Sequence, residues 1–440
     1  MHNINLTGIL NTYEYEELIK VFLKPHEYVV TVSDGNTLEK NDLKRRIYTQ
    51  LSELTGKKPE WGILTGVRPV KLAGELYNKI KNKSKVREIL TGEYFLTDEK
   101  AELLINIYEY QQSVLETCGK EYVGIYIGIP FCPTRCLYCS FTSNQASDEK
   151  INEYLSALYK EIEFTGREMK RLKMKPETVY FGGGTPTILS ASKLRSLLSH
   201  IKSNFELSDL KEFTVEAGRP DTITSEKLRV MEEAGVSRIS INPQSMQERT
   251  LQTIGRSHTS SDIKEAFHIA RTEGHYAINM DLIAGLPGEN AKDFANTVAQ
   301  IIELAPENIT VHTLAVKRAS QLKDVDSEYH YKQGEVVKEM LDIGNESLKN
   351  AGYVPYYLYR QKHMAGNFEN IGWCKADTAG IYNIRIMEEA QTIVALGAGG
   401  ITKVYYADEN RLERVPNVAN YEIYISKINE MINRKAANLF

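Results

Sequence analysis

Between residues 124 and 313, short apolar runs alternate with longer amphipathic segments. The short runs are rich in Ile, Val, Phe and Tyr, and they predict six β-strands, at 124–129, 178–181, 213–216, 238–241, 276–283 and 309–313. The segments between them have apolar residues at helical spacing and predict helices at 151–169, 191–204, 225–234, 261–273 and 291–305. Strands that alternate with helices favour a parallel sheet wrapped by helices. We therefore predict an α/β fold with a partial, TIM-like (β/α)6 barrel, since eight such units would close the ring.

Residues at the ends of these helices match known capping preferences. Ser190 and Ser225 are candidate N-caps, because a serine hydroxyl can accept a hydrogen bond from a free backbone N–H in the first turn. Gly235 and Gly274 follow the last predicted helical residue, where a left-handed C-cap suits glycine.

The chain on either side of this region has a different pattern. Before it, the sequence predicts a strand at 28–32 and a helix at 98–114. After it, we expect a helix at 328–350, a strand with four tyrosines, further strands at 392–396 and 402–406, and a last helix at 421–434. These changes predict three parts: an N-terminal α+β accessory domain at 1–118, a barrel core at 119–315, and a C-terminal α+β domain at 316–440 that covers the substrate.

Composition and charge narrow the class of protein. Hydrophobic residues make up 42% and charged residues 25% of the 440 residues, and the formal net charge is -4, so no global basic field favours nucleic acid. No apolar run approaches the roughly 18 to 20 residues of a membrane span. The N-terminus carries Glu14, Glu16 and Glu17 where a signal peptide would be basic, and we expect a cytoplasmic protein.

Three of the five cysteines lie within eight positions, directly after the first predicted strand. Cys132, Cys136 and Cys139 have the spacing C-x3-C-x2-C, which can place three thiolates around a cubane [4Fe–4S] cluster. No fourth ligand follows nearby, so one iron stays open, and S-adenosylmethionine (SAM) can chelate it through its amino and carboxylate groups. An electron from the cluster would then split the C–S bond and yield a 5′-deoxyadenosyl radical that abstracts hydrogen. A structural zinc site is the alternative, but zinc normally takes four protein ligands and the nearest other cysteine, Cys118, precedes the strand.

Candidate SAM ligands follow the other strands, because ligands of parallel βα folds bind at the carboxyl ends of the strands. After the second strand come Gly183, Gly184 and Thr185, where backbone without side chains can approach the methionine part of SAM. The ionisable and amide candidates are Glu216 for the ribose hydroxyls, Gln244, Arg256 for the SAM carboxylate, and Asp281 inside an apolar strand.

Each of these residues also has a structural interpretation. The glycines suit a tight turn, Glu216 a strand-end ion pair, and Gln244 a turn. Arg256 could be a surface cation and Asp281 an internal helix cap. Tyr126, within the first strand, packs near the cluster or belongs to the core.

Three motifs together resemble the oxygen-independent coproporphyrinogen III oxidase (dehydrogenase) family of radical SAM enzymes. They are Tyr126-x-x-Ile-Pro-Phe-Cys-x3-Cys-x-Tyr-Cys139, Phe181-Gly-Gly-Gly-Thr-Pro-Thr187 and Asp281-Leu-Ile-x-Gly-Leu-Pro-Gly288. The resemblance covers about residues 120–320. Three further segments, at 64–69, 365–370 and 395–400, resemble its HemZ-type branch.

The resemblance implies an activity and roles for residues. Two propionates of coproporphyrinogen III lose CO2 and become vinyl groups, which gives protoporphyrinogen IX in anaerobic haem synthesis. The three cysteines would bind the cluster, the strand-end candidates would contact SAM, and Tyr126 would act near the cluster. It also implies an electron donor such as flavodoxin or ferredoxin, and an electron acceptor.

The sequence departs from that family at two positions. Phe141 stands where the established dehydrogenases have a fourth cysteine, and Gly128 where they have histidine. The Cys-Ser-Phe ending resembles members that act as haem chaperones or as haem-modifying methyltransferases. A tetrapyrrole needs cations for its carboxylates, and the candidates are Arg68, Lys317, Arg318, Arg360 and Lys362. A haem chaperone would need a haem ligand, for which His363 and Cys374 are candidates.

Overall fold

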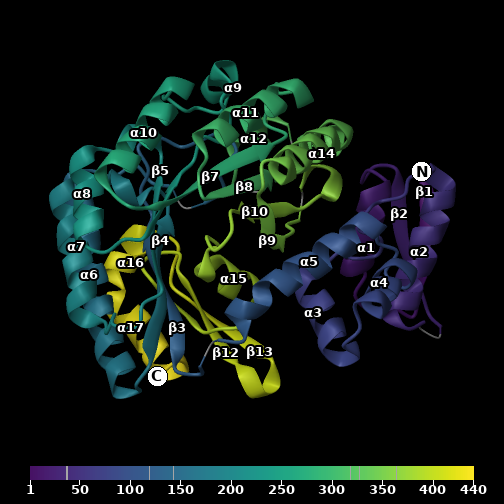
Figure 1. Ribbon diagram of the computed structural model, residues 1–440. Helices are drawn as coiled ribbons and strands as arrows, with labels where there is room; N and C mark the ends of the chain where they lie inside the picture. Colours follow the sequence, from purple (N-terminus) through teal and green to yellow (C-terminus); the bar gives the residue numbers. More distant parts are fainter. Residues whose placement is uncertain (36–37, 118, 142, 318, 327, 363) are drawn as a thin grey trace.

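The computed structural model describes residues 1–440 apart from 36–37, 118, 142, 318, 327 and 363. Within these residues the dominant feature is an 11-stranded mixed sheet in the order β13-β12-β11-β3-β4-β5-β6-β7-β8-β10-β9 (Figure 1). Its centre consists of six parallel strands, β3 (Tyr122–Ile129), β4 (Lys175–Gly183), β5 (Glu212–Gly218), β6 (Arg238–Ile241), β7 (Ala277–Ala284) and β8 (Asn308–Thr313). The α/β fold and its six βα units are thereby confirmed.

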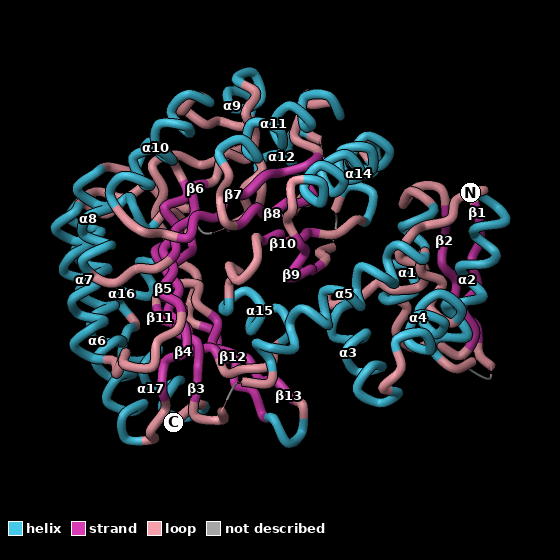
Figure 2. Tube along the Cα trace, viewed as in Figure 1, coloured by secondary structure: helices cyan, strands magenta, loops and turns pink. Residues whose placement is uncertain are grey.

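Helices cover the outer face of this sheet, as Figure 2 shows in cyan. They are α6 (Asp148–Arg171), α7 (Ala191–Asn204), α8 (Ser225–Glu233), α10 (Ser260–Glu273) and α11 (Ala291–Leu304), with the short α9 (Glu248–Thr253) after β6. Each predicted helix lies within three residues of an observed one, because the apolar spacing that predicts it also packs it on the strands.

The predicted caps are partly wrong. Ser190 caps α7 and accepts a hydrogen bond from the Lys193 backbone. In α8, however, the cap is Thr224 rather than Ser225, since the helix begins one residue earlier than the cap prediction requires. Gly235 has the expected positive φ of 84°. Gly274 is extended, with φ of -167°, because the chain turns there directly toward β7.

The C-terminal segment joins the same sheet at both edges. On one edge β11 (Ile393–Leu396) runs parallel to β3, with Ile393 opposite Gly124, followed by β12 (Ile401–Tyr406) and β13 (Arg411–Pro416). On the other edge β10 (Asn370–Cys374) runs antiparallel to β8, and β9 (Val354–Tyr359) follows. These strands therefore extend the core sheet instead of forming one of their own. The boundary at 315 stays a prediction.

Two predicted C-terminal helices are interrupted. The expected helix at 328–350 consists of α13 (Tyr329–Lys332) and α14 (Gly334–Asn350), preceded by α12 (Gln321–Val325). The expected last helix consists of α16 (Tyr421–Ser426) and α17 (Ile428–Asn438), and α15 (Ile381–Glu388) lies between β10 and β11.

The N-terminal residues form two different packing units. The first is a small lobe with parallel strands β1 (His2–Thr7) and β2 (Tyr28–Ser33), helices α1 (Tyr13–Phe22) and α2 (Lys40–Thr55), and its own apolar core (purple in Figure 1). The second consists of α3 (Pro69–Ile80), α4 (Lys83–Gly92) and α5 (Asp98–Leu115), whose buried residues belong to the barrel's core. The strand predicted at 28–32 and the helix at 98–114 are confirmed as β2 and α5.

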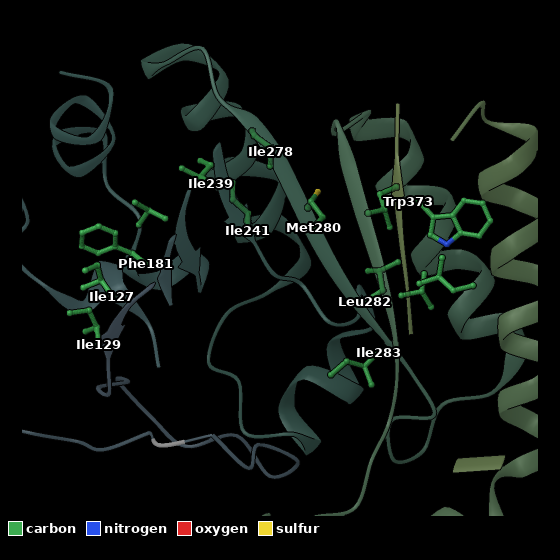
Figure 3. Packing of buried hydrophobic residues seen from close by; sticks show 14 of the residues in the cluster. Ile127, Ile129, Phe181, Ile239, Ile241, Ile278, Met280, Leu282, Ile283 and Trp373 are labelled. Atoms are coloured by element: carbon green, nitrogen blue, oxygen red, sulfur yellow. The ribbon is translucent and has the colours of Figure 1, made fainter. Parts of the chain in front are cut away.

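The main core lies between the sheet and its helices. Figure 3 shows the buried strand residues, among them Ile127, Phe181, Ile239 and Leu282, together with Trp373 from β10. Burying one such side chain contributes about 1.5–3 kcal/mol relative to leaving it exposed. The cysteine loop and the strand ends are therefore carried by a rigid scaffold.

None of the described helices combines the length and the apolar character that crossing a bilayer requires.

A buried ion pair holds the C-terminal helix α17 against α6. Lys435 Nζ lies 2.5 Å from Glu161 Oε1, and both side chains are almost completely buried. Glu161 also accepts hydrogen bonds from Tyr424 Oη at 2.5 Å and from the Gly397 backbone at 2.8 Å. Burial alone would raise the pKa of Glu161, but Lys435 and these donors outweigh it and hold the pKa below its ordinary value.

Candidate active site

A cavity of about 470 Å³ lies at the carboxyl ends of the central parallel strands. It is lined by all eleven candidate residues, which are Tyr126, Cys132, Cys136, Cys139, Gly183, Gly184, Thr185, Glu216, Gln244, Arg256 and Asp281. They come from β3, β4, β5 and β7 and from the segments that follow β3, β4 and β6. One cavity thus brings the whole predicted set together, while the individual roles stay predictions.

The cysteine loop begins directly after β3. The Cys132 backbone N–H donates to the Asn144 carbonyl at 3.0 Å, and that of Leu137 donates to the Ile254 carbonyl at 3.0 Å. Cys132 and Cys136 are buried, and Cys132 Sγ lies 3.4 Å from Thr185 Oγ1. Burial raises the pKa of the Cys132 thiol to about 11, so a thiolate there requires nearby positive charge such as iron provides.

The donor set suits a cluster better than a single ion. Among the described residues, no group of three or more His, Cys, Asp or Glu side chains could hold one metal ion. In a cubane cluster each thiolate binds a separate iron, so the three sulfur atoms do not have to converge on one metal ion. Cys118, the nearest further ligand for a zinc site, lies outside the described residues.

The glycine-rich segment packs directly against the cysteine loop. Gly183 has a φ of 111°, which side chains rarely adopt. A Cβ on Gly184 would lie 2.4 Å from the Phe131 carbonyl oxygen, and the Thr185 N–H donates to that oxygen at 2.8 Å. The structure therefore adds a second reason for glycine here, namely close contact with the backbone just before Cys132.

Glu216 lies at the end of β5 beside a stack of tyrosines. Tyr180 Oη donates to Glu216 Oε1 at 2.6 Å. Burial raises the pKa of Glu216 to about 7, and Asp281 adds to that rise while the Tyr180 hydrogen bond opposes it. The Tyr180 ring stacks on Tyr382 at 4.4 Å and on Tyr126 at 6.3 Å between centroids. Burial raises the pKa of Tyr126, so this phenol keeps its proton at neutral pH.

Gln244 and Arg256 present polar atoms to the cavity. The Gln244 backbone, with a φ of 66°, exchanges hydrogen bonds with β7 at the Asp281 carbonyl (2.9 Å) and the Ile283 N–H (3.0 Å). Arg256 is 8% exposed and donates to the Asn242 carbonyl at 2.7 Å and to Tyr138 Oη at 3.2 Å. It is therefore no surface cation.

Several buried polar atoms of this wall have no hydrogen-bond partner among the described residues. They are Ser240 Oγ, Asn242 Oδ1, Gln244 Oε1 and Arg256 Nε. Buried polar groups are rarely left unpaired in native proteins. Acceptors and a cationic donor beside the cysteine loop fit the amine and the carboxylate of SAM, so the residues present suit this cofactor.

The opposite wall contains a polar network centred on Asp281. Asn279 Nδ2 donates to Asp281 Oδ1 at 2.7 Å, and His312 Nε2 lies 3.7 Å from the same oxygen. Burial would raise the pKa of Asp281, but His312 and Asn279 outweigh it and lower the pKa. His312 Nδ1 is 3.2 Å from Tyr359 Oη. Asp281 lies within β7, and the helix that follows, α11, is capped by Asn290. The helix-cap interpretation of Asp281 is therefore wrong.

The predicted cations have different environments. Lys317 lines the cavity, with its Nζ 5.9 Å from the centre of the Phe141 ring. The others lie elsewhere: Arg68 pairs with Glu389 at 2.8 Å, Arg360 donates to the backbone carbonyls of Leu64 and Asn367, and Lys362 contacts Tyr13. Arg318 lies outside the described residues.

Of the two suggested haem ligands, the structure describes Cys374 alone. His363 lies outside the described residues. Cys374 is buried, donates to Tyr110 Oη at 3.3 Å and is not among the lining residues, although its apolar cluster shares Tyr357 with the cavity wall.

Sequence reasoning missed several polar cavity residues, among them Tyr180, Arg219, His312 and Tyr359. Tyr180 and His312 lie within predicted strands, where a check of every polar strand residue would have found them. Tyr359 comes from β9, whose place beside β10 no local pattern reveals.

Comparisons with known proteins agree with this arrangement. Residues 126–301 match the model of the Radical SAM superfamily. The chain is 39% identical over 401 residues to the oxygen-independent coproporphyrinogen-III oxidase-like protein HemZ of Bacillus subtilis, covering 90% of this chain and 80% of that protein. It is also 38% identical over 193 residues to the heme chaperone HemW of B. subtilis, which covers 44% of this chain and half of HemW.

Among solved structures, coproporphyrinogen III oxidase (HemN) from Escherichia coli aligns with a TM-score of 0.58 at 21% sequence identity. The alignment covers 74% of this chain and 73% of HemN, which supports the shared fold. The HemZ match extends over most of both chains, and the central residues match the Radical SAM superfamily model. This chain therefore belongs to the oxygen-independent coproporphyrinogen III oxidase-like family of radical SAM proteins, within its HemZ branch.

Proposed function

We propose that the protein is a radical SAM oxidoreductase of the coproporphyrinogen III dehydrogenase type, which converts two propionates of its substrate to vinyl groups. The observation that carries this proposal is the single cavity in which three cysteines face unpaired buried polar atoms of β6 and the loops after it. The names of two similar proteins, the coproporphyrinogen-III oxidase-like HemZ and the coproporphyrinogen III oxidase HemN, support the substrate class.

A [4Fe–4S] cluster with one open iron would supply the electron for reductive cleavage of SAM, the chemistry needed to remove hydrogen from a propionate β-carbon. Cys132, Cys136 and Cys139 would hold that cluster at the end of β3. Arg256 and Gln244 would bind the methionine part of SAM, and Glu216 would accept hydrogen bonds from its ribose. With a pKa of about 7, Glu216 is a good acceptor only when the solution is neutral or alkaline.

The cavity walls protect a reactive species from water. Tyr126, Tyr180 and Tyr382 form one aromatic face, and Ile283 and Leu314 add apolar surface from β7 and the residue after β8. A dry, preorganised site strengthens each polar contact inside it.

The substrate end of the cavity lies toward β8, β9 and β10. Lys317 supplies a cation for a propionate carboxylate, and His312 supplies a second polar contact on the same side. Phe141, 66% exposed beside the cysteine loop, offers an apolar contact either for the tetrapyrrole or for an electron donor such as flavodoxin or ferredoxin.

One anaerobic assay tests the proposal. Reconstituted protein is incubated with reductant, SAM and coproporphyrinogen III, and the products are separated by chromatography. We expect the vinyl-bearing tetrapyrrole and 5′-deoxyadenosine to accumulate together, in proportion to each other. Formation of 5′-deoxyadenosine without vinyl product would rule out the dehydrogenase while leaving radical SAM chemistry in place.

A haem chaperone with the same cluster is the second candidate, supported by Phe141 in place of a fourth cysteine and by the HemW match. It requires stoichiometric haem uptake without SAM turnover. A radical SAM methyltransferase that opens haem is the third, and it would consume SAM and release iron from haem. Adding haem to the same assay, with optical detection, separates the three.

A further inference from the structure

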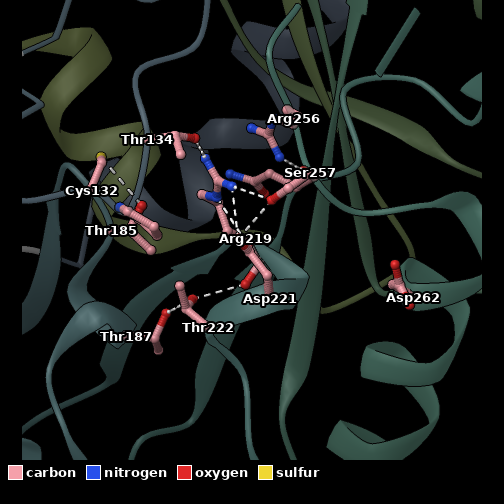
Figure 4. Close-up of polar contacts among 12 residues, drawn as sticks. Cys132, Thr134, Thr185, Thr187, Arg219, Asp221, Thr222, Arg256, Ser257 and Asp262 are labelled. Carbon is pink, nitrogen blue, oxygen red and sulfur yellow. Dashed lines mark hydrogen bonds and ion pairs between the residues drawn. The ribbon is translucent and has the colours of Figure 1, made fainter. Parts of the chain in front are cut away.

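Arg219 occupies a central position beneath the cysteine loop. It follows Gly218, the last residue of β5, whose φ of 56° turns the chain at that point. The side chain is 4% exposed. Figure 4 shows its guanidinium between the cysteine loop, Asp221 and Ser257. A buried arginine at a strand end is costly to desolvate, so its partners are informative.

Every nitrogen of this guanidinium has a hydrogen-bond partner. Nε and Nη2 donate to the two carboxylate oxygens of Asp221 at 2.9 and 2.8 Å, a bidentate pair. Nη1 donates to Thr134 Oγ1 at 2.6 Å, and Nη2 also reaches Ser257 Oγ at 3.2 Å. Thr134 lies between Cys132 and Cys136, while Ser257 directly follows Arg256.

Asp221 is itself fixed to the backbone that precedes it. Pro220 rigidifies the link to Arg219, and Thr222 Oγ1 donates to the Arg219 carbonyl at 2.8 Å. Burial would raise the pKa of Asp221, but Arg219 outweighs it and lowers the pKa, so the carboxylate stays charged at neutral pH. The Arg219–Asp221 pair is therefore a rigid unit with no net charge.

The neighbouring charges argue for a geometric role. His258 is neutral at pH 7, because burial, followed by the charge of Arg256, lowers its pKa to about 4. Asp221 cancels the charge of Arg219. What Arg219 contributes to the cysteine loop is therefore a hydrogen-bond donor held in a fixed direction toward Thr134. Lysine cannot reproduce this, because it lacks the planar fork that contacts Asp221 and Thr134 together.

We propose that Arg219, held by Asp221, is a positioning residue that clamps Thr134 of the cysteine loop and ties it to the Arg256 segment. It thereby helps to set the relative position of the cysteine loop, whose open iron would chelate the amino acid group of SAM, and of Arg256, which would pair with the SAM carboxylate. This inference rests on the proposed cluster and SAM site. It adds that Arg219, through Thr134 and Ser257, reinforces a link that the Leu137–Ile254 and Arg256–Tyr138 hydrogen bonds also make between the cysteine loop and the Arg256 segment.

The test compares Arg219→Lys, Thr134→Val and the double variant with wild type. Arg271→Lys is the control, because Arg271 also pairs with a carboxylate, its Nη2 donating to both oxygens of Glu307, away from the cavity lining. For each anaerobically reconstituted protein, iron and sulfide content is measured, and the EPR spectrum of the reduced cluster is titrated with SAM.

We expect both single variants to keep wild-type iron content but to bind SAM roughly tenfold more weakly, the effect of losing one charge-assisted hydrogen bond. Their SAM-bound EPR spectra should differ from wild type, whereas Arg271→Lys should match it. The double variant should bind SAM no more weakly than the weaker-binding single variant, because both substitutions remove the same Arg219–Thr134 hydrogen bond.

Unchanged SAM affinity and spectra in both single variants would overturn the inference, as would fully additive losses. If Arg219→Lys fails to fold, Thr134→Val alone decides, since it replaces a hydroxyl by a methyl group of similar size. A wild-type protein without a cluster would instead refute the proposed function.

Discussion

Tyr180 on β4 donates a 2.6 Å hydrogen bond to Glu216 on the neighbouring strand β5, and both side chains line the cavity. The phenol stabilises the ionised form of a carboxyl group that burial otherwise keeps protonated near neutral pH. Because the ionisation of Glu216 changes near neutral pH, the binding of SAM should depend on pH in the same range.

SAM binding should strengthen as pH rises from 6 to 8. The ionised Glu216 accepts ribose hydrogen bonds better than the protonated form, and its pKa is about 7. Isothermal titration of the anaerobic protein at several pH values measures this dependence. A SAM affinity that stayed flat across this range would remove Glu216 as the ribose acceptor.

Tyr180→Phe should move this dependence to higher pH. The variant loses the hydrogen bond that lowers the pKa of Glu216, so a higher pH is needed to ionise it. The same titration series gives the new midpoint. Tyr159→Phe is a suitable control, because Tyr159 lies on α6 outside the cavity lining. A midpoint that moved to lower pH would contradict the assigned role of the phenol.

Glu216→Gln should stabilise the protein while weakening SAM binding. The pKa of Glu216 rises from 4.5 to about 7 on folding, so ionising it costs stability that is lost progressively as pH rises between these values. Glutamine avoids this cost, which amounts to about 3 kcal/mol above pH 7 and vanishes below pH 4.5. Urea unfolding at pH 5 and pH 8 checks it. Equal gains at both pH values would show that ionisation is not the cause.

Gly184→Ala should disturb the cysteine loop. Its Cβ would lie 2.4 Å from the Phe131 carbonyl oxygen, and backbone must shift to relieve the contact. We expect lower iron content after reconstitution. Gly92→Ala at the end of α4, where a Cβ meets nothing within 4 Å, should leave iron content unchanged. Full iron content in Gly184→Ala would show that the loop adapts freely.

Lys435→Met should destabilise the C-terminal helix. It leaves Glu161 buried without its cation, and breaking a buried pair in this way costs about 3–5 kcal/mol. Denaturant unfolding measures the loss. The double variant with Glu161→Gln should recover most of it, because no unpaired charge remains. A double variant as unstable as Lys435→Met would show that packing, not charge, causes the effect.

The sequence was sufficient for the features that depend on local patterns. The strand predicted at 238–241 coincides with β6, since four consecutive buried residues leave little freedom in its bounds. The cysteine spacing and the strand-end rule brought all eleven candidates to one cavity. Both depend on neighbours in sequence or on a general property of parallel sheets.

Features that depend on distant pairing could not be predicted. β11 pairs with β3 across more than 260 positions, and β10 joins β8 as a short antiparallel neighbour. Arg219 was missed for a related reason: a lone arginine after a strand resembles a surface cation until the fold places Thr134 and Ser257 around it.

The most direct test of the central claim is the spectrum of the cluster. Wild type and a Cys136→Ser variant are purified and reconstituted without air, reduced, and examined by EPR and Mössbauer spectroscopy with and without SAM. The account predicts a [4Fe–4S] signal in wild type that changes when SAM binds, and loss of intact cluster in the variant. Zinc in place of iron, or a cluster signal that SAM leaves unchanged, would contradict it.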